Sequence, residues 1–173
     1  MFYKIIMLAG LFGLNSIAAV NQAKRVYDSR SSLTKKYRTM VIELVDAGFH
    51  YSAVPWMKEY LTRSRSSFDS DLEKAFEEMV AVVGPRQFET LPLRSLRGKK
   101  SNSLYYVIAK KRMRSGKYSD AISYAERVNS NHPIRPFASN LLAAANSNLG
   151  RYSSALSSFK ECQRLSESMM SRP

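Results

Sequence analysis

Residues 115–125 read SGKYSDAISYA, and residues 149–159 repeat that pattern as LGRYSSALSSF. The matching residues are a glycine, a tyrosine, a serine and an alanine, each displaced by 34 positions: Gly116 with Gly150, Tyr118 with Tyr152, Ser119 with Ser153, and Ala121 with Ala155. Apolar residues on both sides of the motif keep the same displacement, such as Ile108 with Leu142. A fixed period of tens of residues indicates stacked structural repeats, which are clearest here over residues 102–169.

Each copy predicts two helices joined at its glycine, with the first pair at 103–115 and 119–130 and the second at 136–149 and 153–167. Glycine allows the chain to reverse tightly, and a small alanine allows two helices to approach closely. The tyrosines are expected to place an aromatic ring in the joint, and the two serines to cap the second helices.

The G-x-Y-x-x-A motif at this spacing resembles the tetratricopeptide repeat (TPR) family, whose period is about 34 residues. The resemblance implies an all-α, right-handed α-solenoid of antiparallel helix pairs. Arg112 and Asn146 depart from the family pattern, because they occupy positions where the family usually has a large apolar residue. We therefore expect the first helices of both repeats to pack less fully than the family pattern implies.

The same phase extends toward the amino terminus. Gly48 and Ala53 precede Gly116 and Ala121 by 68 positions, twice the period, so residues 34–67 form a weaker first repeat. Residues 68–101 are degenerate, with one apolar-faced helix that begins in a capping box of Ser70 and Glu73. Residues 94–102 are basic and predict an exposed connection. The domain therefore spans 34–169 with about four repeats, one degenerate, and a tail at 170–173.

Residues 1–19 have a short charged start at Lys4, an uncharged apolar run, and small residues around Ala18. These are the features of a secretory signal peptide, so we expect export to the periplasm or cell envelope. A short uncleaved membrane anchor through residues 5–20 is the alternative. Residues 20–33 predict a linker.

The chain has 27 Lys and Arg against 14 Asp and Glu, a net charge of +13. This excess attracts anionic partners, although a solvated basic surface explains it equally well. Cys162 is the only cysteine, so no internal disulfide can form. Its counterpart one repeat earlier is Val128, which predicts a buried, unreactive side chain.

No residue pattern supports catalysis. His50 and His132 lack metal-ligand spacing, and the acidic run Asp71, Glu73, Glu77 and Glu78 is typical of a solvated helix face. We therefore predict that the protein is not an enzyme, binds no metal or cofactor, and does not bind nucleic acid.

The family resemblance implies a scaffold that binds a protein or peptide along a wall built from the first helix of each repeat. On helix 103–115 that face comprises Tyr106, Lys110, Met113 and Arg114, while Tyr105, Ile108 and Ala109 face the core. On helix 136–149 it comprises Asn140, Ala144, Ser147 and Asn148. We expect this basic concave groove to bind an acidic or carboxylate-bearing segment.

The alternative function is a structural helical subunit of a larger envelope or membrane complex, without a separable peptide ligand. An apolar patch left uncovered on an end repeat would favour this alternative, because repeat proteins normally cover such faces.

Overall fold

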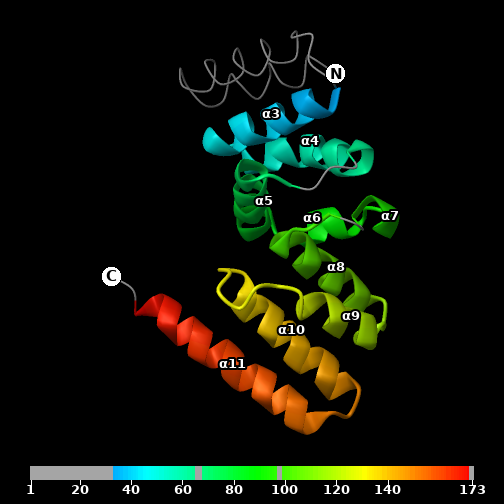
Figure 1. Cartoon of the computed structure of the whole chain (residues 1–173), viewed down its shortest axis with the longest axis vertical. Helices are drawn as coiled ribbons and strands as arrows, with labels where there is room; N and C mark the ends of the chain where they lie inside the picture. Colours follow the sequence, from blue (N-terminus) through cyan, green and yellow to red (C-terminus); the bar gives the residue numbers. More distant parts are fainter. Residues whose placement is uncertain (1–32, 65–67, 97–98, 172–173) are drawn as a thin grey trace. The chain divides into compact units, whose positions relative to one another are not determined.

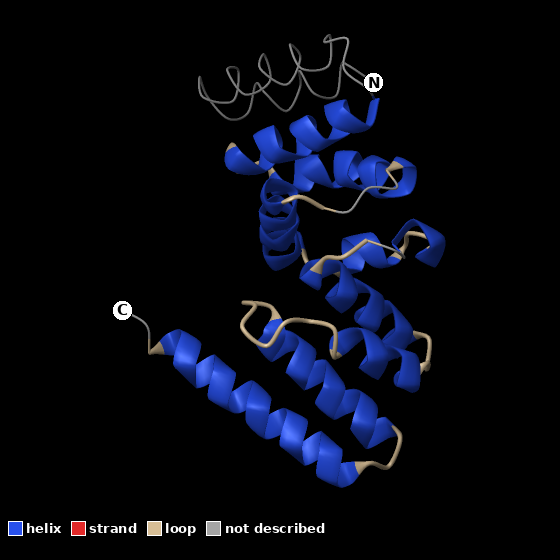
Figure 2. Cartoon of the chain, in the orientation of Figure 1, coloured by secondary structure: helices blue, strands red, loops and turns tan. Residues whose placement is uncertain are grey.

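The computed structural model describes residues 33–64, 68–96 and 99–171, where the regular elements are all helices (Figure 1). Figure 2 shows no strand in these ranges, so the prediction of an all-α fold is confirmed. The chain divides into two compact units at Gly84 and Pro85. The predicted repeat domain over 34–169 includes parts of both units. The predicted signal peptide and most of the predicted linker lie outside the described residues.

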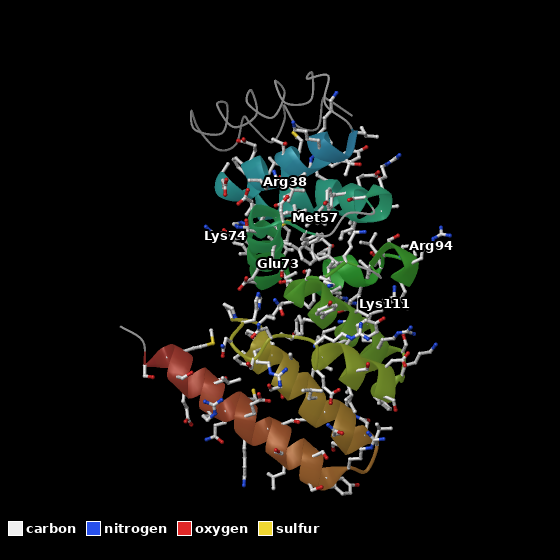
Figure 3. All side chains as sticks on the ribbon, in the orientation of Figure 1. Arg38, Met57, Glu73, Lys74, Arg94 and Lys111 are labelled. Atoms are coloured by element: carbon white, nitrogen blue, oxygen red, sulfur yellow. The ribbon has the colours of Figure 1, made fainter. Side chains whose placement is uncertain are left out.

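The first unit contains α3 (Leu33–Asp46), α4 (His50–Arg63) and α5 (Ser70–Val83). The helices α3 and α4 are joined at Gly48, which has a φ of 79°, and the amide of Phe49 donates to the carbonyl of Leu44 at 2.7 Å. Each helix contributes one apolar stripe to a common core, which includes Val41, Val45, Ala53, Met57, Leu61, Leu72, Phe76 and Met79. Met57, labelled in Figure 3, has no exposed surface.

The start of α5 is fixed by Asp69, one residue before the predicted Ser70. The Asp69 carboxylate accepts a hydrogen bond from the amide of Leu72 at 3.0 Å, so it caps the helix. Arg38 of α3 binds the same carboxylate at 2.6 Å and Asp71 at 3.1 Å. The hydrogen bond from Arg38 is the largest influence lowering the pKa of Asp69. A carboxylate therefore caps α5 and also ties it to α3.

The second unit contains two short helices followed by two longer pairs: α6 (Arg86–Glu89), α7 (Leu93–Leu96), α8 (Asn102–Arg114), α9 (Tyr118–Ala125), α10 (Arg135–Asn148) and α11 (Tyr152–Met170). The turns between paired helices contain Gly116 and Gly150, with φ of 67° and 72°. These positive values explain why the sequence repeats glycine there. The α10 helix packs against α9 and α8 as well as against α11.

Three local boundaries differ from the sequence prediction. The helices α9 and α11 begin at Tyr118 and Tyr152, so Ser119 and Ser153 lie inside them and do not cap them. The preceding Lys117 and Arg151 form no side-chain cap either. The predicted exposed connection at 94–102 is wrong in part, because Ser95, Leu96, Lys99 and Ser101 are buried. The reason is that α6 and α7 pack against α8.

The repeated alanine and tyrosine positions differ in burial between the helix pairs. Ala53 and Ala121 have no exposed surface, whereas Ala155 is only half-buried. Tyr118 is half-buried, but Tyr152 is 73% exposed, so its ring lies in solvent instead of in a joint. The cause is that α10 covers α9, whereas among the described helices only α10 packs extensively on α11.

Candidate functional site

The outward face of α10 carries a stripe of small and polar residues that begins with an aromatic ring. Its exposed members are Phe137, Asn140, Ala144, Ser147 and Asn148. They share one face because they recur at three- and four-residue spacing. The opposite face packs Ala138, Leu142 and Ala145 into the core. Pro136 in the first turn fixes φ where no helical donor is needed, so the helix begins just before the stripe.

Phe137 is the one large apolar side chain of this stripe, and it is 60% exposed. Its ring lies 6.4 Å from the ring of Tyr106 on α8, with the two planes tilted by 54°. Tyr106 is 8% exposed, and burial, followed by the charge of Glu89, raises the pKa of its phenol. The prediction that Tyr106 is open to a partner is therefore wrong. Tyr106 supports Phe137, which is the ring that a partner can reach.

Arg114 was predicted to project freely into the groove, but it forms an ion pair inside the unit. Its Nη1 lies 3.0 Å from Oε2 of Glu89, which is only 6% exposed, whereas the Arg114 side chain is 52% exposed. Sequence spacing within one helix could not reveal this pair, because Glu89 comes from the short α6 helix of the degenerate repeat.

Lys111, labelled on α8 in Figure 3, also binds α6 and the segment that follows it. Its Nζ donates hydrogen bonds to the carbonyl oxygens of Glu89 and Leu91, the latter at 2.6 Å. These carbonyls lie at the carboxyl end of α6, where backbone acceptors have no helical donor. A lysine charge is well placed there. Lys111 therefore holds α6 and the following turn against α8.

The remaining arginines of α8 and α10 also have internal carboxylates. Arg112, 8% exposed, forms an ion pair with Asp120 of α9 at 3.3 Å. Arg135 binds Glu161 of α11 at 3.2 Å and donates to the carbonyl of Val128 at 2.9 Å. The helices α8 and α10 together contain five basic residues and no acidic residue. Lys111 is held by backbone carbonyls, so Lys110 is the one of the five with neither an ion pair nor a side-chain hydrogen bond in the described part of the chain.

Arg112 and Asn146 are the two positions where the sequence departs from the TPR pattern, and both are buried. Asn146 satisfies its amide by donating to the carbonyl of Leu142 at 3.0 Å. A cleft of about 350 Å³ lies beside Asn146, between α9, α10 and α11. It is lined by apolar Ile122 and Leu142 and by polar Glu126, Asn146, Arg151 and three serines. This cleft has both an acid and a base in its lining, so its charge favours neither ion.

The predicted binding residues thus fall into three groups. Asn140 and Asn148 are exposed on α10, although the Asn148 amide donates to the carbonyl of Ala144 at 2.8 Å. Lys110 and Met113 are half-buried on α8. Tyr106 and Arg114 are engaged internally. Phe137 was not among the predicted binding residues, although an apolar residue directly after Pro136 and outside the buried stripe was a usable signal.

Neither histidine-based nor carboxylate-based chemistry emerges in the described ranges. His50 pairs with Glu78 at 2.8 Å, and Asp71 pairs with Arg38. Residues 33–64, 68–96 and 99–171 contain no group of three or more His, Cys, Asp or Glu side chains that could hold a metal ion. Among the helices in those ranges, none has the length and apolar character needed to cross a bilayer.

Comparison with known proteins supports the helical repeat class. Residues 89–173, just under half of the chain, match the family described as "Bacterial transcriptional activator domain". A solved structure titled "Crystal structure of MamA" aligns with a TM-score of 0.59 at 14% identity, covering 93% of this chain and 99% of that one. A second, titled "MamA MSR-1 C2", aligns with a TM-score of 0.56 at 17% identity, covering 96% and 94%. No curated protein matches the sequence.

The chain is therefore a TPR-like helical repeat protein, as its 34-residue period predicted. At these identities, the likeness to the MamA structures establishes the fold alone.

Proposed function

We propose that the face formed by α8 and α10 binds a segment of a protein partner that carries an apolar side chain and a carboxylate. The observation that carries the proposal is the exposed ring of Phe137, which rests on buried Tyr106 at the start of the α10 stripe. A rigidly supported aromatic ring is a typical anchor of protein interfaces. Ala144 and Ser147 follow it along the helix and leave room for a backbone.

Apolar burial contributes more to this binding than charge does. Covering the 60% of Phe137 that is exposed is worth about 1–2 kcal/mol, since full burial of such a side chain is worth about 1.5–3 kcal/mol. An ion pair of half-buried Lys110 with a partner carboxylate adds about 0.2–1 kcal/mol and weakens in salt. Lys110 therefore selects an acidic partner, whereas Phe137 supplies most of the affinity.

The first experiment identifies the partner. A photoreactive amino acid at exposed Asn140 should crosslink one protein in the native source, and the same group at exposed Ser123 on α9 should not. With the purified partner, Phe137→Ala should weaken binding about tenfold, or 1.4 kcal/mol. Tyr51→Ala is the matched control, because Tyr51 is an aromatic ring that is 67% exposed in the other unit. Equal affinity of the wild type and Phe137→Ala would show that this face is not the site.

The basic residues of α8 and α10 do not favour nucleic-acid binding at this face, despite the name of the matched family. Phosphate binding requires cations that are free to contact a backbone. On α8 and α10, four of the five cations, Lys111, Arg112, Arg114 and Arg135, are held by internal partners.

We also propose that the protein is exported to the periplasm or cell envelope. The support is the sequence of residues 1–19, with an apolar run of about half the length of a membrane span. Amino-terminal sequencing of the native protein should show a start near Ala19 or Val20. An intact Met1 on a membrane-bound protein would instead establish the anchor.

A second candidate function, a structural subunit of a larger assembly, is favoured by one observation. The side of α11 that carries Tyr152, Leu156 and Phe159 is apolar, and each of these side chains is more than half exposed. An uncovered apolar face is an interaction surface, because soluble proteins rarely leave one open. Fractionation of native extracts should then show the protein only in a complex of fixed composition, whereas the first proposal expects a separable partner.

A further inference from the structure

The exposed side of α11 carries a regular seam. The seam consists of residues at alternating spacings of four and three: Tyr152, Leu156, Phe159, Gln163, Ser166 and Met170. This spacing averages 3.5 residues, the period with which helices pair in coiled coils. Leu156 and Phe159 are 56% and 55% exposed, and Tyr152 and Met170 are 73% and 79% exposed.

The preceding repeat shows what normally covers this position. One period earlier, the counterparts of Leu156 and Phe159 are Ile122 and Ala125 on α9, which are 8% and 0% exposed. They are buried partly because α10 packs against α9. In the described part of the chain, no helix takes that place on α11. The seam is thus built to receive a helix.

We propose that the occupant is α11 of a second copy of this chain. The two helices pack antiparallel about a two-fold axis that crosses them at the level of residue 161, the midpoint of the seam. The order of spacings reads the same in both directions, so an antiparallel copy places every seam position opposite another seam position. Tyr152 lies opposite Met170, Leu156 opposite Ser166, and Phe159 opposite Gln163. Such self-complementarity is what an isologous dimer interface requires.

The charge of α11 permits this pairing in a chain that otherwise repels its own copies. The full chain has a net charge of +13. The helix carries two basic residues, Lys160 and Arg164, and two acidic residues, Glu161 and Glu167, of which Glu161 is held inside the unit by Arg135. None of the six seam residues is charged, so an acidic or basic partner helix would find no opposite charge on the seam, whereas a second α11 would meet no like charge there.

The area of the seam sets the strength of the dimer. Four exposed apolar side chains contribute about 130 Å² each, given about 200 Å² for a fully exposed large side chain. The dimer therefore buries about 1,000 Å² in total, near the lower end for specific interfaces. We expect a reversible dimer with a dissociation constant of about 10–100 µM.

Sedimentation velocity of the full chain over about 1–300 µM tests the association across this range. The double variant Leu156→Asp, Phe159→Asp should remain monomeric throughout. The control double variant Ser157→Asp, Ser168→Asp adds the same charges to exposed positions of the same helix away from the seam, and it should dimerise like the wild type. Circular dichroism should show unchanged helix content in both, because all four positions are exposed.

A distance measurement tests the orientation. A nitroxide label on Ser153→Cys, in a Cys162→Ser background, should report an axial separation of about 24 Å, because 16 residues separate position 153 from its symmetry-related counterpart at 1.5 Å each. A parallel pair would bring the two labels within about 10 Å of each other. Three results would overturn the proposal: a wild type monomeric at 300 µM, a dimer unaffected by the seam variant, or the short distance.

Discussion

The ion pair between Arg114 and Glu89 predicts an asymmetric response to losing one partner or the other. Glu89 is 6% exposed and its Oε1 has no hydrogen-bond partner among the described residues, whereas Arg114 is 52% exposed. Arg114→Met keeps the aliphatic packing but leaves a buried carboxylate without its cation. We expect a loss of about 2–3 kcal/mol in the free energy of unfolding, since a buried charge deprived of its partner is costly.

The opposite substitution should cost much less. Glu89→Gln removes the charge, keeps the shape, and leaves Arg114 in contact with water. Its cost is expected to stay below about 1 kcal/mol, because a half-exposed cation needs no internal partner. The difference in cost between the two variants corresponds to a melting temperature about 10 °C lower for Arg114→Met than for Glu89→Gln in a unit of this size.

Urea denaturation followed by far-UV circular dichroism measures both free energies. Trp56, the only tryptophan, lies in α4, so its fluorescence reports on the first unit in the same sample. Lys117→Met is the matched control, because it removes an exposed cation near the end of α8. The reasoning is refuted if Arg114→Met costs no more than Glu89→Gln. It would then follow that water reaches the Glu89 carboxylate.

Three further predictions use the remaining contacts. Ala121→Leu should destabilise by about 1–3 kcal/mol by overpacking a site with no exposed surface, whereas Ala155→Leu, half-buried, should cost less than about 1 kcal/mol in urea titrations. Gly116→Ala should cost about 1 kcal/mol from its φ of 67° alone, because the added Cβ meets no atom within 4 Å; a cost near zero in thermal melts would contradict this. Arg38 lowers the pKa of Asp69, so this carboxylate stabilises the fold above its unfolded pKa of about 3.9, and the contribution is lost as pH falls through the lower folded value. Asp69→Asn should therefore be less stable than the wild type at pH 7 and equal to it at about pH 2, measured by denaturant titration.

The sequence predicted the fold correctly where the repeated residues meet a structural requirement of the helix pairs. Gly116 and Gly150 mark positions that need positive φ, and an alanine follows where helices approach closely, so the period located the helix pairs of residues 102–169. The sequence also predicted a short helix from Pro85 to about Thr90, which α6 confirms, but it did not predict α7, because a four-residue helix is too short to show a helical period. Their buried residues, such as Phe88 and Leu96, are spaced irregularly along the chain.

The candidate site was harder to predict for a related reason. Helical spacing assigns residues to a face, but it contains no information about which other element covers that face. Tyr106 and Arg114 were assigned to an open wall, yet α6 brings Glu89 close to both of them. Phe137 was overlooked because the prediction transferred positions from α8, where the corresponding residue is the small Ser103.

The boundary between the two compact units, at Gly84 and Pro85, falls inside one sequence repeat, so the units that fold are not the units that repeat in the sequence. By period, residues 68–101 are one repeat, but α5 packs with α3 and α4, whereas α6 and α7 pack with α8. A fragment that begins at the repeat border near residue 102 would strip from α8 the carboxylate of Glu89 and the carbonyls that bind Lys111. Gene duplication would copy 34 residues at a time, but a fragment able to fold independently should begin at Pro85.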